Sequence, residues 1–243
     1  MRIFLAGAAG VVGRRLVPLL VGAGHQVTGT TRSPEKAAEL ARAGAAAAVV
    51  DVFDAPALTR AVAAAKPDVV IHQLTDLPDV FDRDTMAAAA KHNSRIRIEG
   101  TANLVAAALA ADARRMVAQS IAFIYAPGPE PHQESDALMS DREGEGAVTA
   151  RGVLALERLV TTTPGLDGIV LRYGRFYGPG TWRTEPGGRG YLHVDAAAHA
   201  ALLAISAGAA GIYNIAADDG EVSIAKARRE WGFDPGFRIG TAA

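Results

Sequence analysis

The beginning of the chain constrains the fold more than any other stretch. Residues 2–6 form an apolar run that leads into glycines at a spacing of three, and these glycines open a second apolar run. In such a turn the first glycine permits the tight bend, the second lets a pyrophosphate approach the backbone, and the third lets a helix pack on a strand. The start of that helix offers free N–H groups and partial positive charge to phosphates. The residues predicted to cradle the phosphates of a dinucleotide are Gly7, Gly10, Val11, Val12 and Gly13.

Short apolar runs alternate with helical patterns along the rest of the chain. We expect strands at 2–6, 26–31, 47–50, 69–72, 116–119, 168–171 and 212–215, with helices between them, the longest at 85–111 and bent near 93–94. This alternation predicts an α/β fold, a doubly wound parallel sheet of the Rossmann type covered by helices on both faces. Residues 1–243 are predicted to form a single NAD(P)-binding domain. Residues 176–243, too few for a second core, would contribute a small, reduced substrate cap.

Composition limits the classes of function. The chain is 49 % hydrophobic and 21 % charged with a net charge of −1, so nothing favours nucleic acid or a membrane surface as a partner. It has no cysteine, which excludes disulfides, thiolate nucleophiles and zinc–thiolate sites, and no His/Asp/Glu cluster has the spacing of a metal site. The apolar start is too short for a signal sequence, so we expect a cytoplasmic protein.

Residues after the second, third and fourth strands are predicted to complete the cofactor site. Arg32 follows the second strand, where an acid would bind the ribose of NAD, and a guanidinium suits the 2′-phosphate of NADP. We therefore favour NADP over NAD, the alternative being NAD bound without an acidic partner. Asp51, followed by Val52, is placed to meet the adenine edge, or it caps a helix or loop instead. The residues predicted to line the cofactor after the fourth strand are Gln73, Leu74 and Thr75.

These stretches resemble the extended short-chain dehydrogenases/reductases, the NAD-dependent epimerase/dehydratase group. The resemblance implies an NAD(P)-dependent oxidoreductase, or an epimerase- or dehydratase-like enzyme, acting on a small carbonyl or hydroxyl compound. It covers nearly the whole chain. Beyond the glycines it rests on Val69-Val-Ile-His-Gln73, Gly100-Thr-Ala-Asn-Leu104, Val117-Ala-Gln-Ser120, Leu171-Arg-Tyr-Gly-Arg-Phe-Tyr-Gly-Pro-Gly180, His193-Val-Asp195 and Gly211-Ile-Tyr-Asn214.

The proton-transfer residues of that family are missing. The resemblance implies a Tyr-x-x-x-Lys dyad with a Ser or Thr, in which lysine lowers the pKa of a tyrosine that exchanges a proton with the substrate. Counting back from Glu157 places Thr149 at the tyrosine position and Val153 at the lysine position. The family serine position falls on Ile121, beside Ser120. Arg97 and Arg175 stand where the family has asparagines.

Other residues at the predicted sheet edge are candidates for the chemistry. Ser120 could bind a substrate carbonyl, and Tyr125 could act as a general acid if a nearby arginine lowers its pKa. Alternatively, the serine caps a turn and the tyrosine packs under the next loop. Tyr173, Arg175 and Tyr177 are candidate substrate-binding residues; Arg175 would bind an anionic group or pair with an acid of loop 126–146.

Three functions follow from these patterns. The first is an NADP-dependent oxidoreductase with a non-standard proton donor, since hydride transfer belongs to the cofactor. The second is a non-catalytic dinucleotide-binding protein that senses redox state. The third is a non-redox lyase, cyclase or isomerase. The resemblance also implies a possible homodimer through the helices at 85–111 and 148–162.

Overall fold

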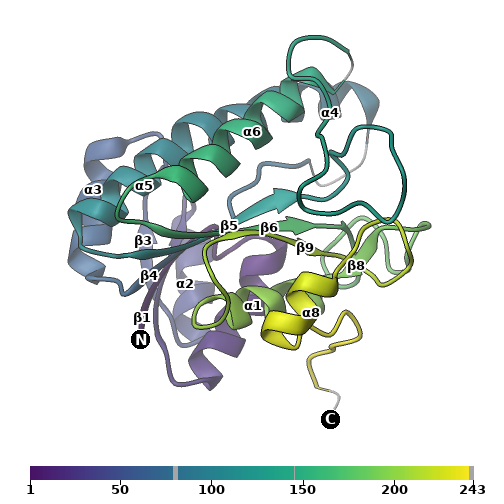
Figure 1. The fold of residues 1–243 in the computed structure, drawn as a ribbon. Coiled ribbons are helices and arrows are strands. Elements are labelled where there is room, and N and C mark those ends of the chain that lie inside the picture. Colours follow the sequence, from purple (N-terminus) through teal and green to yellow (C-terminus); the bar gives the residue numbers. More distant parts are fainter. Residues whose placement is uncertain (79–81, 145, 241–243) are drawn as a thin grey trace.

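A seven-stranded, wholly parallel sheet forms the centre of the protein. The computed structural model describes residues 1–78, 82–144 and 146–240. The strand order is β3-β2-β1-β4-β5-β6-β9, which confirms the predicted doubly wound sheet (Figure 1). The strands are β1 Arg2–Ala6, β2 Gln26–Thr31, β3 Ala46–Val49, β4 Val69–His72, β5 Arg115–Ile121, β6 Asp167–Tyr173 and β9 Gly211–Ile215.

Helices cover both faces of this sheet. The strands at its centre are apolar on both faces because each face is buried under a helical layer. No helix in the described part of the chain is long and apolar enough to cross a membrane. One face carries α3 Ala55–Ala65, α4 Arg83–Arg95, α5 Thr101–Ala110 and α6 Ala147–Thr162; the other carries α1 Val11–Gly22, α2 Pro34–Arg42, α7 Val194–Ala204 and α8 Ala225–Trp231 (Figure 1).

The helix predicted at 85–111 is three elements. Helix α4 begins at Arg83, two residues before the predicted start, and ends at Arg95. A π-helical turn, η1 Ile96–Gly100, separates it from α5. The irregularity therefore lies beyond the predicted bend at 93–94. A Cβ on Gly100 would lie 3.1 Å from Val52, so the glycine allows this turn to approach the loop after β3.

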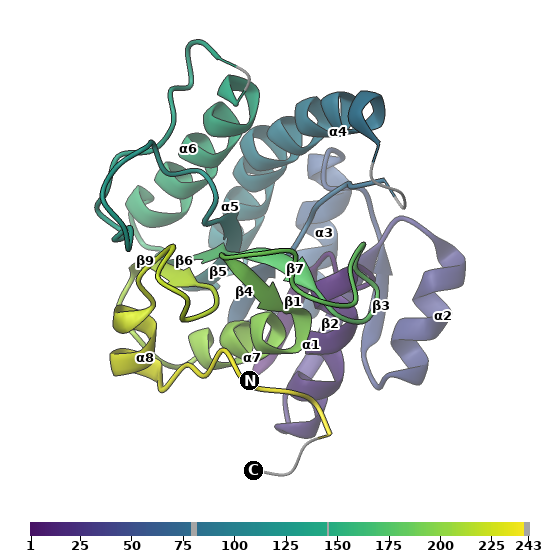
Figure 2. The ribbon, with the colours of Figure 1, turned by 90° about the vertical axis from the view of Figure 1, so that its right-hand side faces the viewer.

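A small two-stranded sheet, which we did not predict from the sequence, follows the carboxyl end of β6. Strands β7 Arg175–Tyr177 and β8 Tyr191–His193 pair in parallel there (Figure 2). Strands of this length have too few residues for a recognisable alternation. Within residues 176–243, α7 and β9 join the main layers, so only part of that range projects from the sheet edge. The role of this range as a substrate cap stays a prediction.

Candidate active site

The glycine turn after β1 leaves no room for side chains. Gly7 has a φ of +86°, and a Cβ there would lie 2.5 Å from the carbonyl oxygen of Gln73. A Cβ on Gly13 would lie 2.2 Å from the carbonyl oxygen of Gly7. The turn is closed by a 3.0 Å hydrogen bond in which the Gly10 N–H donates to the same oxygen. A ligand could therefore approach the backbone of this turn without meeting side chains at Gly7, Gly10 or Gly13.

The start of α1 fits a phosphate ligand. No side chain caps α1 at Gly10, and its first turn contains no acidic residue. Val11 and Val12, predicted to present their N–H groups, are in that turn. At the end of the neighbouring strand β4, the side-chain oxygen of Gln73 is buried without a hydrogen-bond partner among the described residues. Uncapped donors and an unpaired acceptor at one edge suit a polar dinucleotide, and these residues fit NAD(P).

Arg32 joins the segments that follow β2 and β4. Its guanidinium lies 3.3 Å from the carboxylate of Asp76, and 59 % of its side chain is exposed. Asp76 is fixed by Asn93, whose side chain exchanges hydrogen bonds of 2.9 and 2.8 Å with the Asp76 backbone. Arg32 is thus on the surface and beside the predicted cofactor, but it already has an acidic neighbour.

Asp51 and Val52 follow β3, and Leu74 and Thr75 follow β4. One oxygen of Asp51 accepts a 2.9 Å hydrogen bond from the N–H of Phe53, so Asp51 stabilises its own loop. The Val52 side chain is buried, and the Leu74 N–H donates to Nδ1 of His72. Thr75 is exposed. Their contacts with the cofactor stay predictions.

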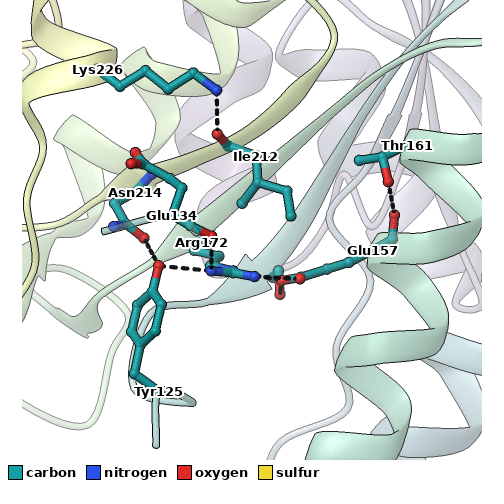
Figure 3. A network of polar contacts seen from close by, with 9 residues as sticks. Tyr125, Glu134, Glu157, Thr161, Arg172, Ile212, Asn214 and Lys226 are labelled. Atoms are coloured by element: carbon teal, nitrogen blue, oxygen red, sulfur yellow. Dashed lines mark hydrogen bonds and ion pairs between the residues drawn. The ribbon is translucent and has the colours of Figure 1, made fainter. Parts of the chain in front are cut away.

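The hydroxyls of Ser120 and Tyr125 are engaged inside the protein (Figure 3). Ser120 is fully buried and donates a 2.8 Å hydrogen bond to Glu157. Arg172 donates to both oxygens of Glu157 at 2.9 and 2.7 Å and to the Tyr125 hydroxyl at 2.7 Å. Tyr125 in turn donates to the Asn214 side chain at 2.6 Å. We call these five residues the Arg172 network; its geometry matches the alternative in which both hydroxyls serve structure.

The condition set for Tyr125 as a general acid is not met. Burial raises the pKa of Tyr125, and the opposing effect of the Arg172 guanidinium is smaller. The expected arginine is therefore present, but desolvation of the phenolate outweighs it. Burial also opposes the charge of Arg172, but its hydrogen bonds to Glu157 outweigh burial and raise the Arg172 pKa. The guanidinium therefore stays charged and paired.

The positions of the family dyad form an apolar wall. Val153 is fully buried and clusters with Ile121, Ile124 and Ala150 at the start of α6 and the end of β5. Thr149 is half-buried in the first turn of α6. Within the described residues of this cluster nothing titrates, so the wall cannot donate or accept a proton in place of the dyad.

His72, at the end of β4, is held in its neutral form. Burial lowers its pKa to about 3. Because its Nδ1 accepts from the Leu74 N–H, its Nε2 carries the proton and donates to Thr101 at 3.1 Å. His72 therefore does not titrate near neutral pH.

The three candidate substrate-binding residues occupy different environments. Tyr173 is 1 % exposed, burial raises its pKa, and its hydroxyl donates to the carbonyl oxygen of Ala197, so it lies in the core rather than on a cleft. Arg175 pairs at 3.1 Å with Glu221, which is outside the predicted loop 126–146. The Tyr177 hydroxyl accepts from Arg238 at 2.8 Å.

Two aromatic residues at this edge were missed from the sequence. Phe123 follows β5, is 40 % exposed, and lies under the Arg175 guanidinium at 4.8 Å. Trp182 is 42 % exposed and donates a 2.9 Å hydrogen bond to the carbonyl oxygen of Pro78, which joins the loop after β7 to the loop after β4. Exposed aromatic residues after strand ends were the available signal.

Comparison with known proteins explains this combination of cradle and sheet. The model of the NAD-dependent epimerase/dehydratase family matches residues 3–189. The chain belongs to this family. It is therefore an NAD(P)-dependent enzyme of the extended short-chain dehydrogenase/reductase type, as predicted, with oxidoreductase- or epimerase-like chemistry. The non-catalytic and non-redox alternatives are not favoured.

Within and beyond this family, the chain is similar to proteins with different activities. A 3-diazoavenalumate denitrifying reductase from a Streptomyces species is 42 % identical over 240 residues, covering 90 % of this chain and 77 % of the relative. The UDP-glucose 4-epimerase of Thermotoga maritima superposes with a TM-score of 0.79 at 17 % identity, covering 98 % of this chain and 95 % of the other. That of Thermus thermophilus, solved with NAD, gives 0.71 at 22 %, covering 90 % and 79 %. At these identities the structures show the shared fold.

Removing one partner of the Arg172 network should destabilise the protein strongly. We expect Glu157→Gln to lower the free energy of unfolding by about 3–5 kcal/mol, because it leaves the buried Arg172 charge without its counterion. Urea denaturation measures the change. The matched control is Glu99→Gln in the exposed Arg95–Glu99 pair, for which we expect a loss below about 0.5 kcal/mol. Similar losses for both variants would show that the network does not hold the fold together.

Proposed function

We propose that this enzyme is a nicotinamide-dependent reductase that removes a diazo group from an aromatic carboxylate. The observation that carries the proposal is the apolar wall of Ile121, Ile124, Ala150 and Val153, which includes the lysine position of the family dyad, with the un-ionisable Thr149 at the tyrosine position. Reduction of a carbonyl produces an alkoxide that needs a proton, and neither that wall nor the Arg172 network offers a ready donor. The substrate should therefore be one whose reduction needs no proton.

An arenediazonium ion meets that requirement. The bound dinucleotide would supply hydride. A new C–H bond forms at the ring carbon, the C–N bond breaks, and its electron pair leaves with N₂. Hydride and the diazonium cation together give the arene, N₂ and the oxidised dinucleotide, so neither side of the balance contains a proton. A relative at 42 % identity is a denitrifying reductase that acts on a diazo carboxylate, and this supports the same class of substrate here.

The residues at the edge suit such a substrate. Water converts a diazonium ion to a phenol, and an apolar wall around the reacting carbon limits that side reaction. The exposed rings of Phe123 and Trp182 offer faces that attract a cation. Arg175 lies over the Phe123 ring and pairs with Glu221, so it would hold that ring in place. Under this proposal Ser120 and Tyr125 position the strand ends rather than react.

The reaction should be detectable with diazotised 3-aminocinnamate. We expect consumption of NADPH with equimolar release of N₂ and formation of cinnamate, above an enzyme-free control. Deuterium from the reactive face of 4-deuterated NADPH should appear on the ring. The kcat should be flat between about pH 5.5 and 7.5, since His72 is neutral throughout and burial raises the pKa of Tyr125 out of this range. Faster turnover of 3-formylcinnamate, or a bell-shaped pH profile, would contradict the proposal.

We also propose that the dinucleotide is NADP, with Arg32 facing its 2′-phosphate. Asp76 competes for the same guanidinium. Arg32→Ala should therefore weaken NADPH at least about tenfold and NADH less than about twofold, whereas Asp76→Asn should tighten NADPH. Fluorescence titration measures both, with the exposed Arg42→Ala on α2 as the control for net charge. Equal losses for the two dinucleotides would refute this preference.

The outer face of α5 and α6 supports a homodimer. Leu109 of α5, Leu154 of α6 and Ile98 of the adjoining turn η1 are exposed, 37 to 39 % each, in contrast to the buried faces of the two helices. We propose that a second copy covers them. Leu154→Glu should convert a dimer to a monomer in sedimentation velocity, and Val49→Glu, on the exposed edge strand β3, should not. A monomeric parent protein would overturn the proposal. The cytoplasmic location expected from the sequence stays a prediction.

A further inference from the structure

Arg97, which stands where the family has an asparagine, is a half-buried arginine that Glu157 influences electrostatically. It lies in the π-helical turn η1, which packs between α4, α5 and α6. Such turns replace regular helix at a cost and are found mostly at functional sites. The side chain is half-buried, yet within the described residues it makes neither a hydrogen bond nor an ion pair.

The two titratable groups that interact electrostatically with Arg97, His72 and Glu157, already have hydrogen-bond partners. The charge of Arg97 contributes to lowering the pKa of His72, and the charge of Glu157 acts to raise the pKa of Arg97. Both ring nitrogens of His72 are engaged, by the Leu74 N–H and the Thr101 hydroxyl. The carboxylate of Glu157 accepts from Ser120 and from two nitrogens of Arg172. His72 thus has no free ring nitrogen, and Glu157 already accepts three hydrogen bonds and shares its charge with Arg172.

Among Arg97, His72, Glu157 and Arg172, all in the described part of the chain, the charges sum to one positive charge in excess. Glu157 is neutralised by Arg172 at 2.7 Å, and His72 is neutral. Burial lowers the pKa of Arg97 to about 10, so the side chain remains charged at neutral pH. A half-desolvated guanidinium without an acceptor is unfavourable until an anion pairs with it.

Arg97 lies opposite the helix that carries the lysine position of the missing dyad. Val153, at the lysine position, is one helical turn before Glu157 on α6, and Arg97 faces the same helix from η1. Helices α4 and α6 approach closely here, since a Cβ on Gly152 would lie 2.8 Å from Cα of Ser94. The cation lost from α6 is thus replaced by one from the opposite helix, beside the wall where the substrate would react.

We propose that Arg97 binds the carboxylate of the substrate and so determines which end of an aromatic acid enters the site. The inference rests on the proposed function for its choice of anion. A hydroxyl of the cofactor ribose could accept from the same donors, but it carries no charge to balance the excess. Arg175 is a less suitable site for the carboxylate than Arg97, because its guanidinium already forms an ion pair with Glu221.

Binding of an unreactive probe tests the proposal without turnover. With NADP⁺ present, we expect the parent enzyme to bind cinnamate at least tenfold more tightly than cinnamamide. Arg97→Gln should abolish that preference by weakening cinnamate alone, and Arg97→Lys should restore part of it. The dinucleotide affinity of both variants should stay within twofold of the parent. Arg95→Gln, two residues away and exposed, is the matched control and should change nothing.

Other outcomes of these binding and melting measurements would assign Arg97 a different role. Equal loss of cinnamate and cinnamamide, or a loss of dinucleotide affinity, would overturn the proposal and assign Arg97 to the cofactor. No preference for cinnamate in the parent would overturn it as well. Without ligands, Arg97→Gln should melt about 2–4 °C higher than the parent because an unpaired charge is removed; a lower melting temperature would mark Arg97 as structural. If cinnamate binding behaves as expected but diazotised 3-aminocinnamate is not reduced, only the proposed reaction fails.

Discussion

The buried ion pair between Glu157 and Arg172 determines how the carboxyl ends of the central strands are held. It joins α6 to β6, and its remaining hydrogen bonds reach β5 through Ser120 and β9 through Tyr125 and Asn214. Breaking a buried pair is costly because the surviving charge has lost both water and counterion. The edge that carries the site is therefore rigid beneath its surface, while its outer side is formed by loops.

The same pair engages the hydroxyls of Ser120 and Tyr125, the two catalytic candidates predicted from the sequence. Ser120 and Tyr125 follow the right strand and carry the right groups, but the Arg172 network uses both hydroxyls. Desolvation then raises the Tyr125 pKa further. With Val153 and Thr149 at the dyad positions, the enzyme retains the phosphate cradle and loses the proton relay. A reaction in which the leaving group takes the electron pair away is consistent with that loss.

Local patterns were enough to predict the cradle and the sheet. Gly7, Gly10 and Gly13 are constrained by contacts within a few residues and with the adjacent strand, so spacing alone identifies them. The side-chain partners could not be predicted, because they depend on residues distant in sequence: Arg172 with Glu157, Arg175 with Glu221, Trp182 with Pro78. The face on which Ser120 lies also depends on strand register, since a shift of one residue reverses it.

The replacement residues form a coherent set rather than scattered losses. Lysine to valine on α6 removes a charge and adds apolar surface, and asparagine to arginine on η1 returns a charge from the other side. The described residues then combine an apolar cluster around Val153 with the half-buried cation Arg97, whose electrostatic neighbour Glu157 is already paired with Arg172. A carbonyl substrate gains nothing from this arrangement, because its oxygen would still need a proton. Under the proposed function, an aromatic carboxylate that carries a diazonium group would gain from both parts, since Arg97 would pair with its acid and the wall would exclude the water that converts it to a phenol.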